Sequence, residues 1–109
     1  MKIEGVPFTS FDWSGAKVSE HAGVTGKAIW RTRELGNVRV RLVEYSPGYK
    51  ADHWCSRGHV IYVLAGTLIT ELKDGRVFTT EAGSIYVVEE NGAAHRSTTV
   101  HGAKLFIVD

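Results

Sequence analysis

Short runs of β-favouring residues, separated by glycine-containing turns, recur along the chain, and this pattern constrains the fold more than any other feature. The chain has 12 glycines and only 2 prolines. Short apolar runs between turn signals are typical of an all-β sandwich or barrel. Helix signals are weak throughout, so we expect an all-β fold of antiparallel strands with little helix.

Two dipeptides mark hairpin turns. Gly36-Asn37 and Asp74-Gly75 both suit the positive φ angles that two-residue hairpin turns require. The first predicts a hairpin of residues 28–35 and 38–45, and the second predicts a hairpin of residues 67–72 and 76–80. The remaining predicted strands are runs that begin or end near a glycine, at residues 60–64, 84–88, 95–100 and 104–108.

The N-terminal residues 1–27 give the weakest signals. Their apolar residues lack a clean period, so we interpret 1–27 as an arm that covers an edge or an end of a barrel formed by residues 28–109. No linker, charge block or internal repeat divides the sequence. A chain of 109 residues, of which 43% are hydrophobic, suits one globular domain. We therefore expect a single domain over residues 1–109.

The charge and composition narrow the range of partners. A formal net charge of +1 gives no electrostatic reason to expect nucleic acid. The longest apolar run is too short to span a bilayer, so no membrane partner is expected. The N-terminus lacks the apolar core of a signal peptide, and the chain has one cysteine. Both features favour a reducing, cytoplasmic location.

Side chains that commonly bind metals gather in one stretch, which holds His53, Cys55 and His59, and His95 follows later in the chain. Residues two apart in a strand share a face, so His53 and Cys55 would point the same way. A bend at residues 56–58 would bring His59 back to them. Imidazole and thiolate suit zinc, iron, nickel or cobalt better than magnesium or calcium. The alternative is that the cysteine packs as a small hydrophobe and the histidines are core or surface groups.

This stretch resembles the first motif of the cupins, in which His-X-His is followed by a glutamate and then by a glycine. The segment His53-X-Cys55-X3-His59-X6-Gly66 matches the motif from its first ligand to its last glycine. Cysteine replaces the second histidine, and histidine replaces the glutamate. The preceding Gly48 lies one residue closer to the first ligand than the motif asks.

The second cupin motif is matched more loosely, by Gly83 and His95, with Glu89 in place of its proline. The order Asp-His-Trp-Cys at residues 52–55 is similar to the small bacterial cupins that are named for a DHCW motif. The resemblance implies a single-domain jelly-roll barrel, also called a double-stranded β-helix. Because small cupins commonly pair, it also implies a homodimer.

The resemblance further implies one divalent transition metal, either zinc, nickel or iron, bound by His53, Cys55, His59 and His95. Three histidines and one thiolate carry the same charge as the three histidines and one glutamate of the usual cupin site. The substitutions therefore keep the charge of the site and make its donors softer.

Other side chains are candidates for contact with a small-molecule ligand or substrate. Tyr45, Tyr86 and Arg96 could line the pocket, and Arg41 could anchor a carboxylate if its face of the strand turns inwards. Two arginines that alternate on a strand, here Arg39 and Arg41, are more typical of a solvated face.

Alternation also gives expectations for three neighbours of the ligands. Trp54 and Tyr62 should face away from the metal, if the strands that carry them are regular. Asp52 either forms a hydrogen bond with the neighbouring ligand His53, without binding the metal itself, or is a solvated acid in a turn.

Three functions are compatible with this pattern. The first is a metal-dependent enzyme that acts on a small molecule, which needs an open coordination position. Four protein ligands leave two such positions on an octahedral ion and none on a tetrahedral zinc. The second is a non-catalytic module in which the metal supports the fold or helps to bind a ligand. The third is a barrel without a metal. No catalytic residue can be assigned from the sequence.

Overall fold

The computed structural model describes residues 2–109. Within that range the chain forms eight strands and no helix. All strand pairs are antiparallel, so the expected fold class is confirmed. The strands are β1 (Lys17–Ala22), β2 (Lys27–Leu35), β3 (Val38–Tyr45), β4 (His59–Leu72), β5 (Val77–Glu81), β6 (Ile85–Val88), β7 (His95–Thr98) and β8 (Ala103–Val108). None of the described residues belongs to a helix that could cross a membrane.

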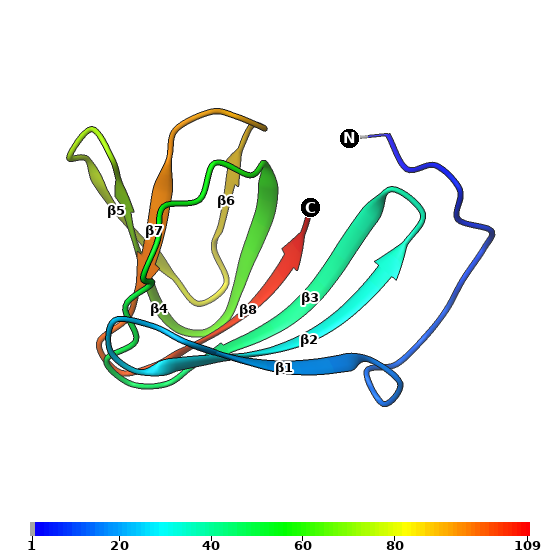
Figure 1. Ribbon diagram of the computed structural model, residues 1–109, viewed down its shortest axis with the longest axis horizontal. Helices are drawn as coiled ribbons and strands as arrows, with labels where there is room; N and C mark the ends of the chain where they lie inside the picture. Colours follow the sequence, from blue (N-terminus) through cyan, green and yellow to red (C-terminus); the bar gives the residue numbers. More distant parts are fainter. Residues whose placement is uncertain (1) are drawn as a thin grey trace.

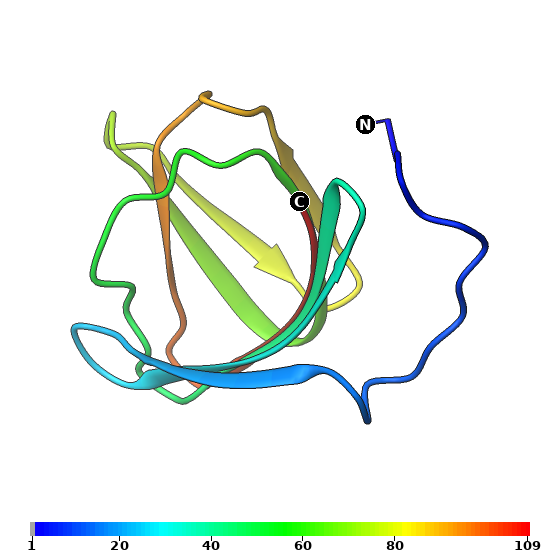
Figure 2. The ribbon, with the colours of Figure 1, turned by 45° about the vertical axis from the view of Figure 1, so that its right-hand side comes forward.

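Two curved layers of strands face each other across the interior. Strands β1, β2, β3 and β8 lie side by side in that order, and β8 pairs with β4 (Figure 1). Strand β4 also pairs with β5, β6 and β7, which rise opposite the first layer. Figure 2 shows the strands curling around a common interior. The hairpin predicted at Gly36-Asn37 is confirmed, because Leu35 pairs with Val38 across that turn.

Strand β4 is longer than the sequence suggested. We expected one strand to end at Ala65-Gly66 and another to begin after it, but the structure has a single strand of 14 residues. The register with β8 shifts between Val63 and Ala65, and Gly66 has a φ of 76°. A bulge followed by a glycine bends a strand without ending its hydrogen bonding. The glycine therefore marks a bend that carries β4 from one layer to the other.

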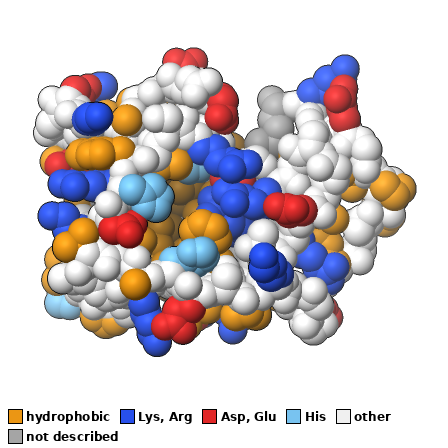
Figure 3. All heavy atoms as spheres, viewed as in Figure 1, with side chains coloured by type: hydrophobic (Ala, Val, Ile, Leu, Met, Phe, Trp, Pro, Cys, Tyr) orange, Lys and Arg blue, Asp and Glu red, His pale blue; other side chains and the backbone are white. Residues whose placement is uncertain are grey.

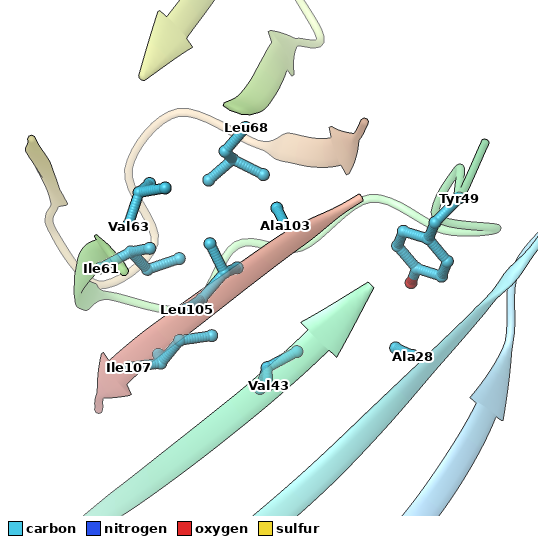
Figure 4. Packing of buried hydrophobic residues seen from close by; sticks show 9 residues of the cluster. All are labelled: Ala28, Val43, Tyr49, Ile61, Val63, Leu68, Ala103, Leu105 and Ile107. Atoms are coloured by element: carbon cyan, nitrogen blue, oxygen red, sulfur yellow. The ribbon is translucent and has the colours of Figure 1, made fainter. Parts of the chain in front are cut away.

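A cluster of buried apolar side chains fills one part of the interior. Figure 4 shows that β4 and β8 supply many of them, with Ile61 and Val63 opposite Leu105 and Ile107. Complete burial of an aliphatic side chain such as Leu105 contributes about 1.5–3 kcal/mol to folding. The whole cluster consists of Ala28, Val43, Tyr49, Ile61, Val63, Leu68, Ala103, Leu105 and Ile107.

The inward rows of three strands change from apolar to polar at the same end of the barrel. On β4, His59 precedes Ile61, and on β8 the row that contains Ile107 continues to Asp109. On β3 the row that contains Val43 begins with Arg39 and Arg41. Because these strands are neighbours in register, the polar ends of the three rows lie together. The polar pocket described below is thus a direct consequence of strand alternation.

The N-terminal stretch contains a strand that the sequence did not indicate. Residues 17–22 of the predicted arm form β1, which pairs with β2 along its whole length. Both faces of β1 are largely polar or exposed, so it has no apolar alternation by which it could be found. Ahead of β1, the Trp13 ring packs edge-on against Phe106 of β8, with 6.4 Å between the ring centroids.

Candidate metal centre

Three side chains that can bind metal converge at the polar end of the barrel. Atoms of Cys55, His59 and His95 that could bind an ion all lie within 4.8 Å of one another. The two imidazoles are buried, and their Nε2 atoms are 2.8 Å apart. Two imidazole nitrogens bound to one tetrahedral zinc, at about 2.0–2.1 Å each, would be separated by about 3.3 Å. The imidazoles are therefore close enough to share an ion after a small movement apart.

The three residues are placed by different elements. His59 is the first residue of β4, and His95 is the first residue of β7. Cys55 lies in the loop before β4, where its backbone forms an isolated antiparallel bridge with His95. The Cys55 N–H donates to the carbonyl of His95 at 2.8 Å, and the His95 N–H donates to the carbonyl of Cys55 at 2.9 Å. This bridge holds Cys55, in the loop, against His95, at the start of the strand.

Hydrogen bonds fix the orientation of both imidazoles. Nδ1 of His95 donates to the backbone carbonyl of Ala93 at 2.8 Å. Nδ1 of His59 lies 3.4 Å from Oδ2 of Asp109. Histidines that bind metals usually donate their other N–H to a carbonyl or carboxylate, which fixes the tautomer. Both Nε2 atoms therefore point at each other, and a metal ion would replace the hydrogen bond that now joins them.

The surroundings of Cys55 favour its thiolate form, which is the form that could bind a metal. A hydrogen bond with the His95 imidazole lowers the pKa of Cys55, although burial of the thiol works in the opposite direction. The same interaction raises the pKa of His95. The backbone N–H of Arg57 donates to the Cys55 sulfur at 3.4 Å and favours the anion further. Since the thiolate is the form that binds metals, these contacts favour coordination.

The fourth predicted ligand, His53, lies outside this group. Its side chain is 79% exposed, and its Nδ1 is 2.6 Å from Oδ1 of Asp52. Residues 52 and 53 form a bend, so the argument from strand alternation does not apply to them. His53 nevertheless lines the same cavity as the three converging residues.

Arginine side chains form the opposite wall of the site, around one buried carboxylate. Arg39 makes two hydrogen bonds to Asp109, at 2.9 and 3.1 Å, and Arg41 makes one at 2.8 Å. Nε of Arg57 is 3.6 Å from the same carboxylate, whose side chain is 0% exposed. The interpretation of Arg39 and Arg41 as a solvated face is therefore wrong. The sequence misled because apolar residues occur on both faces of β3, so alternation does not show which face points inwards.

The environment of Asp109 keeps it ionised. Burial by itself would raise the pKa of this carboxyl, but hydrogen bonds from His59 and Arg39 and the charges of Arg41 and Arg39 hold it well below the usual range. One oxygen of Asp109 thus contacts both a candidate metal ligand and the arginine wall. Sequence reasoning missed this residue. The inward alternation of Leu105 and Ile107 would have indicated it.

A cavity of about 450 Å³ opens between these two walls. All four side chains that were predicted to contact a ligand line it, namely Arg41, Tyr45, Tyr86 and Arg96. Burial raises the pKa of Tyr45 and of Tyr86, so both phenols stay protonated. Figure 3 shows this face of the molecule, with hydrophobic atoms lining a hollow beside a group of basic side chains.

Two tryptophans also line the cavity. The guanidinium of Arg96 lies over the ring of Trp54, 4.4 Å from its centroid, and the guanidinium of Arg41 lies at the same distance over Trp30. The expectation that Trp54 faces away from the ligands is wrong, because its segment is a loop rather than a regular strand. Tyr62 is 38% exposed on the outer face, as expected.

Comparison with known proteins finds matches at the level of structure only. No family model and no curated protein matches the chain. A cupin-2 domain containing protein from Shewanella frigidimarina has 24% sequence identity and a TM-score of 0.61, covering 73% of this chain and 78% of that chain. A sugar phosphate isomerase of the cupin superfamily from Silicibacter pomeroyi has 14% identity and a TM-score of 0.67, covering 92% of this chain and 74% of that chain.

A mutant of oxalate decarboxylase from Bacillus subtilis is a third similar structure. It has 22% identity and a TM-score of 0.68, and the match covers 97% of this chain but 31% of that chain. At these identities the matches speak for the fold and not for a shared activity. Together with the two antiparallel layers and their strand order, they show that this chain adopts the cupin fold.

Proposed function

We propose that the protein is a metal-dependent enzyme that acts on a small molecule in the cavity. One divalent transition metal, either zinc, nickel or iron, would be held by Cys55, His59 and His95. The observation that carries the proposal is the convergence of these three donors beside a cavity of about 450 Å³. Three protein ligands leave an open position even on a tetrahedral ion, as catalytic zinc sites do.

The residues around the ion would have three roles: to orient the imidazoles, to donate hydrogen bonds to the bound molecule and to bind it by charge. A bound divalent ion would polarise a substrate oxygen or acidify a bound water. Asp109 and the carbonyl of Ala93 orient the two imidazoles through their Nδ1 atoms. The protonated phenols of Tyr45 and Tyr86 can donate hydrogen bonds to a bound molecule. Arg41 and Arg96 would orient it by charge.

Metal analysis tests the proposal directly. Protein purified without chelator or nickel resin should contain stoichiometric metal by mass spectrometry. His59→Ala should lose it, whereas His101→Ala should keep it, because His101 is exposed and lines a different pocket. A wild type that contains no stoichiometric metal after supplementation would overturn the proposal.

A second candidate is a non-catalytic module in which the ion is fully coordinated by protein. The position of His53 on the same cavity favours it, because a movement of that loop would supply a fourth ligand. X-ray absorption spectroscopy of the loaded protein separates the two candidates. Two imidazoles, one sulfur and an exchangeable oxygen support the enzyme, while three imidazoles and one sulfur support the module.

We also propose that the protein is a cytoplasmic homodimer that pairs through the outer face of β4 and β6. Tyr62, Leu64, Ile85 and Val87 are 38–69% exposed there. The chain's own N-terminal segment already covers the adjoining part of this face at Phe106. A second copy is the occupant that would cover the remaining apolar surface on both partners at once.

Light scattering of the full chain tests this pairing. The wild type should have the mass of a dimer at micromolar concentration, and Val87→Glu should have the mass of a monomer. Val77→Glu is the matched control, since Val77 is 60% exposed on β5 and lies outside the proposed interface. A monomeric wild type would contradict the proposal.

A further inference from the structure

Apart from Cys55, whose thiolate would bind the metal, the charged side chains that line the cavity are all positive. Within residues 2–109, four arginines contribute to its surface and no aspartate or glutamate does, although the chain contains 12 acidic residues. Asp109 lies behind the wall, where Arg39 and Arg41 already engage it. The divalent ion of the proposed function would add further positive charge. Such a cavity favours an anion over a neutral or cationic molecule.

The arginines are held in fixed orientations. Arg41 lies between the ring of Trp30 and the carboxylate of Asp109, with its side chain only 6% exposed. Its Nε has no hydrogen-bond partner among the residues that the structure describes. Arg96 is held in the same way, between the ring of Trp54 and the carboxylate of Glu71 at 3.1 Å. A planar guanidinium fixed in place suits the geometry of a carboxylate and loses little entropy on binding one.

Much of the rest of the wall is apolar or aromatic, although Ser56 and Ser97 also line it. Trp30, Tyr49, Ile61, Tyr86 and Ile107 all contribute to it. A volume of about 450 Å³ is within the range of cavities that hold small organic molecules. The ligand should therefore have a compact apolar body as well as an acidic group.

We infer that the cavity takes a small aromatic or aliphatic carboxylate, whose acid group binds Arg41 and Arg57 next to the metal. Both arginines contact the carboxylate of Asp109, which also contacts the metal ligand His59. The acid group is thereby placed close to the ion. This inference names the substrate class of the proposed enzyme and rests on that function only for the role of the metal.

The test compares benzoate with benzamide, which has the same shape but no charge. Binding is measured by calorimetry, once on metal-loaded protein and once on protein treated with chelator. Benzoate should bind in both states, and benzamide should bind at least about tenfold more weakly, because it lacks charge-assisted hydrogen bonds to arginine. Arg41→Gln and Arg57→Gln should each weaken benzoate binding by a similar factor in the metal-free protein.

The controls keep the inference separate from the metal. Arg31→Gln should bind benzoate like the wild type, because Arg31 lies outside the cavity beside Glu44. Arg57 is half exposed, so its variant remains informative if Arg41→Gln does not fold. If benzoate binds but the supplemented wild type never takes up stoichiometric metal, the proposed enzyme is overturned and this inference stands. Equal binding of benzoate and benzamide, or tighter binding of inorganic phosphate, would overturn the inference whatever the metal content.

Discussion

The two walls of the cavity are built in different ways. The wall that carries Cys55, His59 and His95 comes from the starts of two strands and a loop, joined by one backbone bridge. The wall that carries Arg39 and Arg41 comes from the interior of β3, a regular strand with neighbours on both sides. The ligand wall is a local construction, whereas the arginine wall depends on the register of the whole sheet.

Asp109 is the point at which the two walls meet. Its carboxylate accepts hydrogen bonds from Arg39 and Arg41 and also contacts Nδ1 of His59. Damage to this residue should therefore affect both walls. Changes elsewhere should affect one wall at a time, and their effects should be smaller.

Asp109→Asn should have the largest effect. It leaves three arginines, of which Arg41 is buried, without their counter-charge, and loss of one partner of a buried ion pair costs about 3–5 kcal/mol. Metal affinity should also fall by about 10–100-fold, because an outer partner of a ligand is lost. Urea denaturation and metal titration measure the two effects. Glu44→Gln is the control, since its pair with Lys104 is partly exposed and contributes about 0–1 kcal/mol.

Removal of the metal should have the next largest effect, confined to the ligand wall. An ion present at a hundredfold excess over its dissociation constant stabilises the folded state by about 2.7 kcal/mol. Chelator should therefore lower the melting temperature of the wild type and leave that of His59→Ala unchanged. An equal drop in both proteins would mean that the chelator acts elsewhere.

The sequence predicted the ligand wall better than the arginine wall for a physical reason. The candidate ligands Cys55 and His59 stand four residues apart on one loop and strand start, so they stand out without knowledge of the sheet, and His95 is added by its place after a second glycine. The sidedness of β3 could not be read in the same way, because Val40 and Leu42 on one face and Val43 on the other are all apolar. Only the pairing of Val43 with Leu105 of β8 reveals which face is inward.

The fold shows the same division between local and long-range signals. The turn at Gly36-Asn37 has positive φ at Gly36, and the Gly-Asn dipeptide predicted this turn from local sequence alone. Gly66 also has positive φ, yet the strand continues through it because β8 pairs on both sides of the bulge. A glycine in the sequence indicates that positive φ is permitted at that position. Whether the strand ends or bends there depends on whether a neighbouring strand continues to pair with it.

Cys55→Ser should weaken the ligand wall alone. It removes the only anionic ligand of the proposed site, so metal affinity should fall by more than about tenfold in competition with a chelator. Benzoate binding by the metal-free protein should stay within about twofold of the wild type, which is a change of about 0.4 kcal/mol or less in the free energy of binding. Ser56→Ala, one residue along the same loop, is the matched control for metal affinity. Unchanged affinity in Cys55→Ser would leave the two histidines as the only protein ligands.

His53→Ala should have the smallest effect, although the cupin-like spacing made His53 the first ligand of the predicted set. Its imidazole is 79% exposed and bonded to Asp52, and the backbone around it forms a bend. An exposed side chain on a bend must give up its freedom to reach an ion, whereas His59 and His95 already have their rings fixed by Nδ1 hydrogen bonds. We therefore expect the variant to keep its metal, with an affinity within about tenfold of the wild type. Metal content and chelator competition provide the measurement, with Asp52→Asn as a second variant that frees the ring without removing it. Loss of the metal in His53→Ala alone would show that the loop closes over the ion, and the ligand wall would then have four members instead of three.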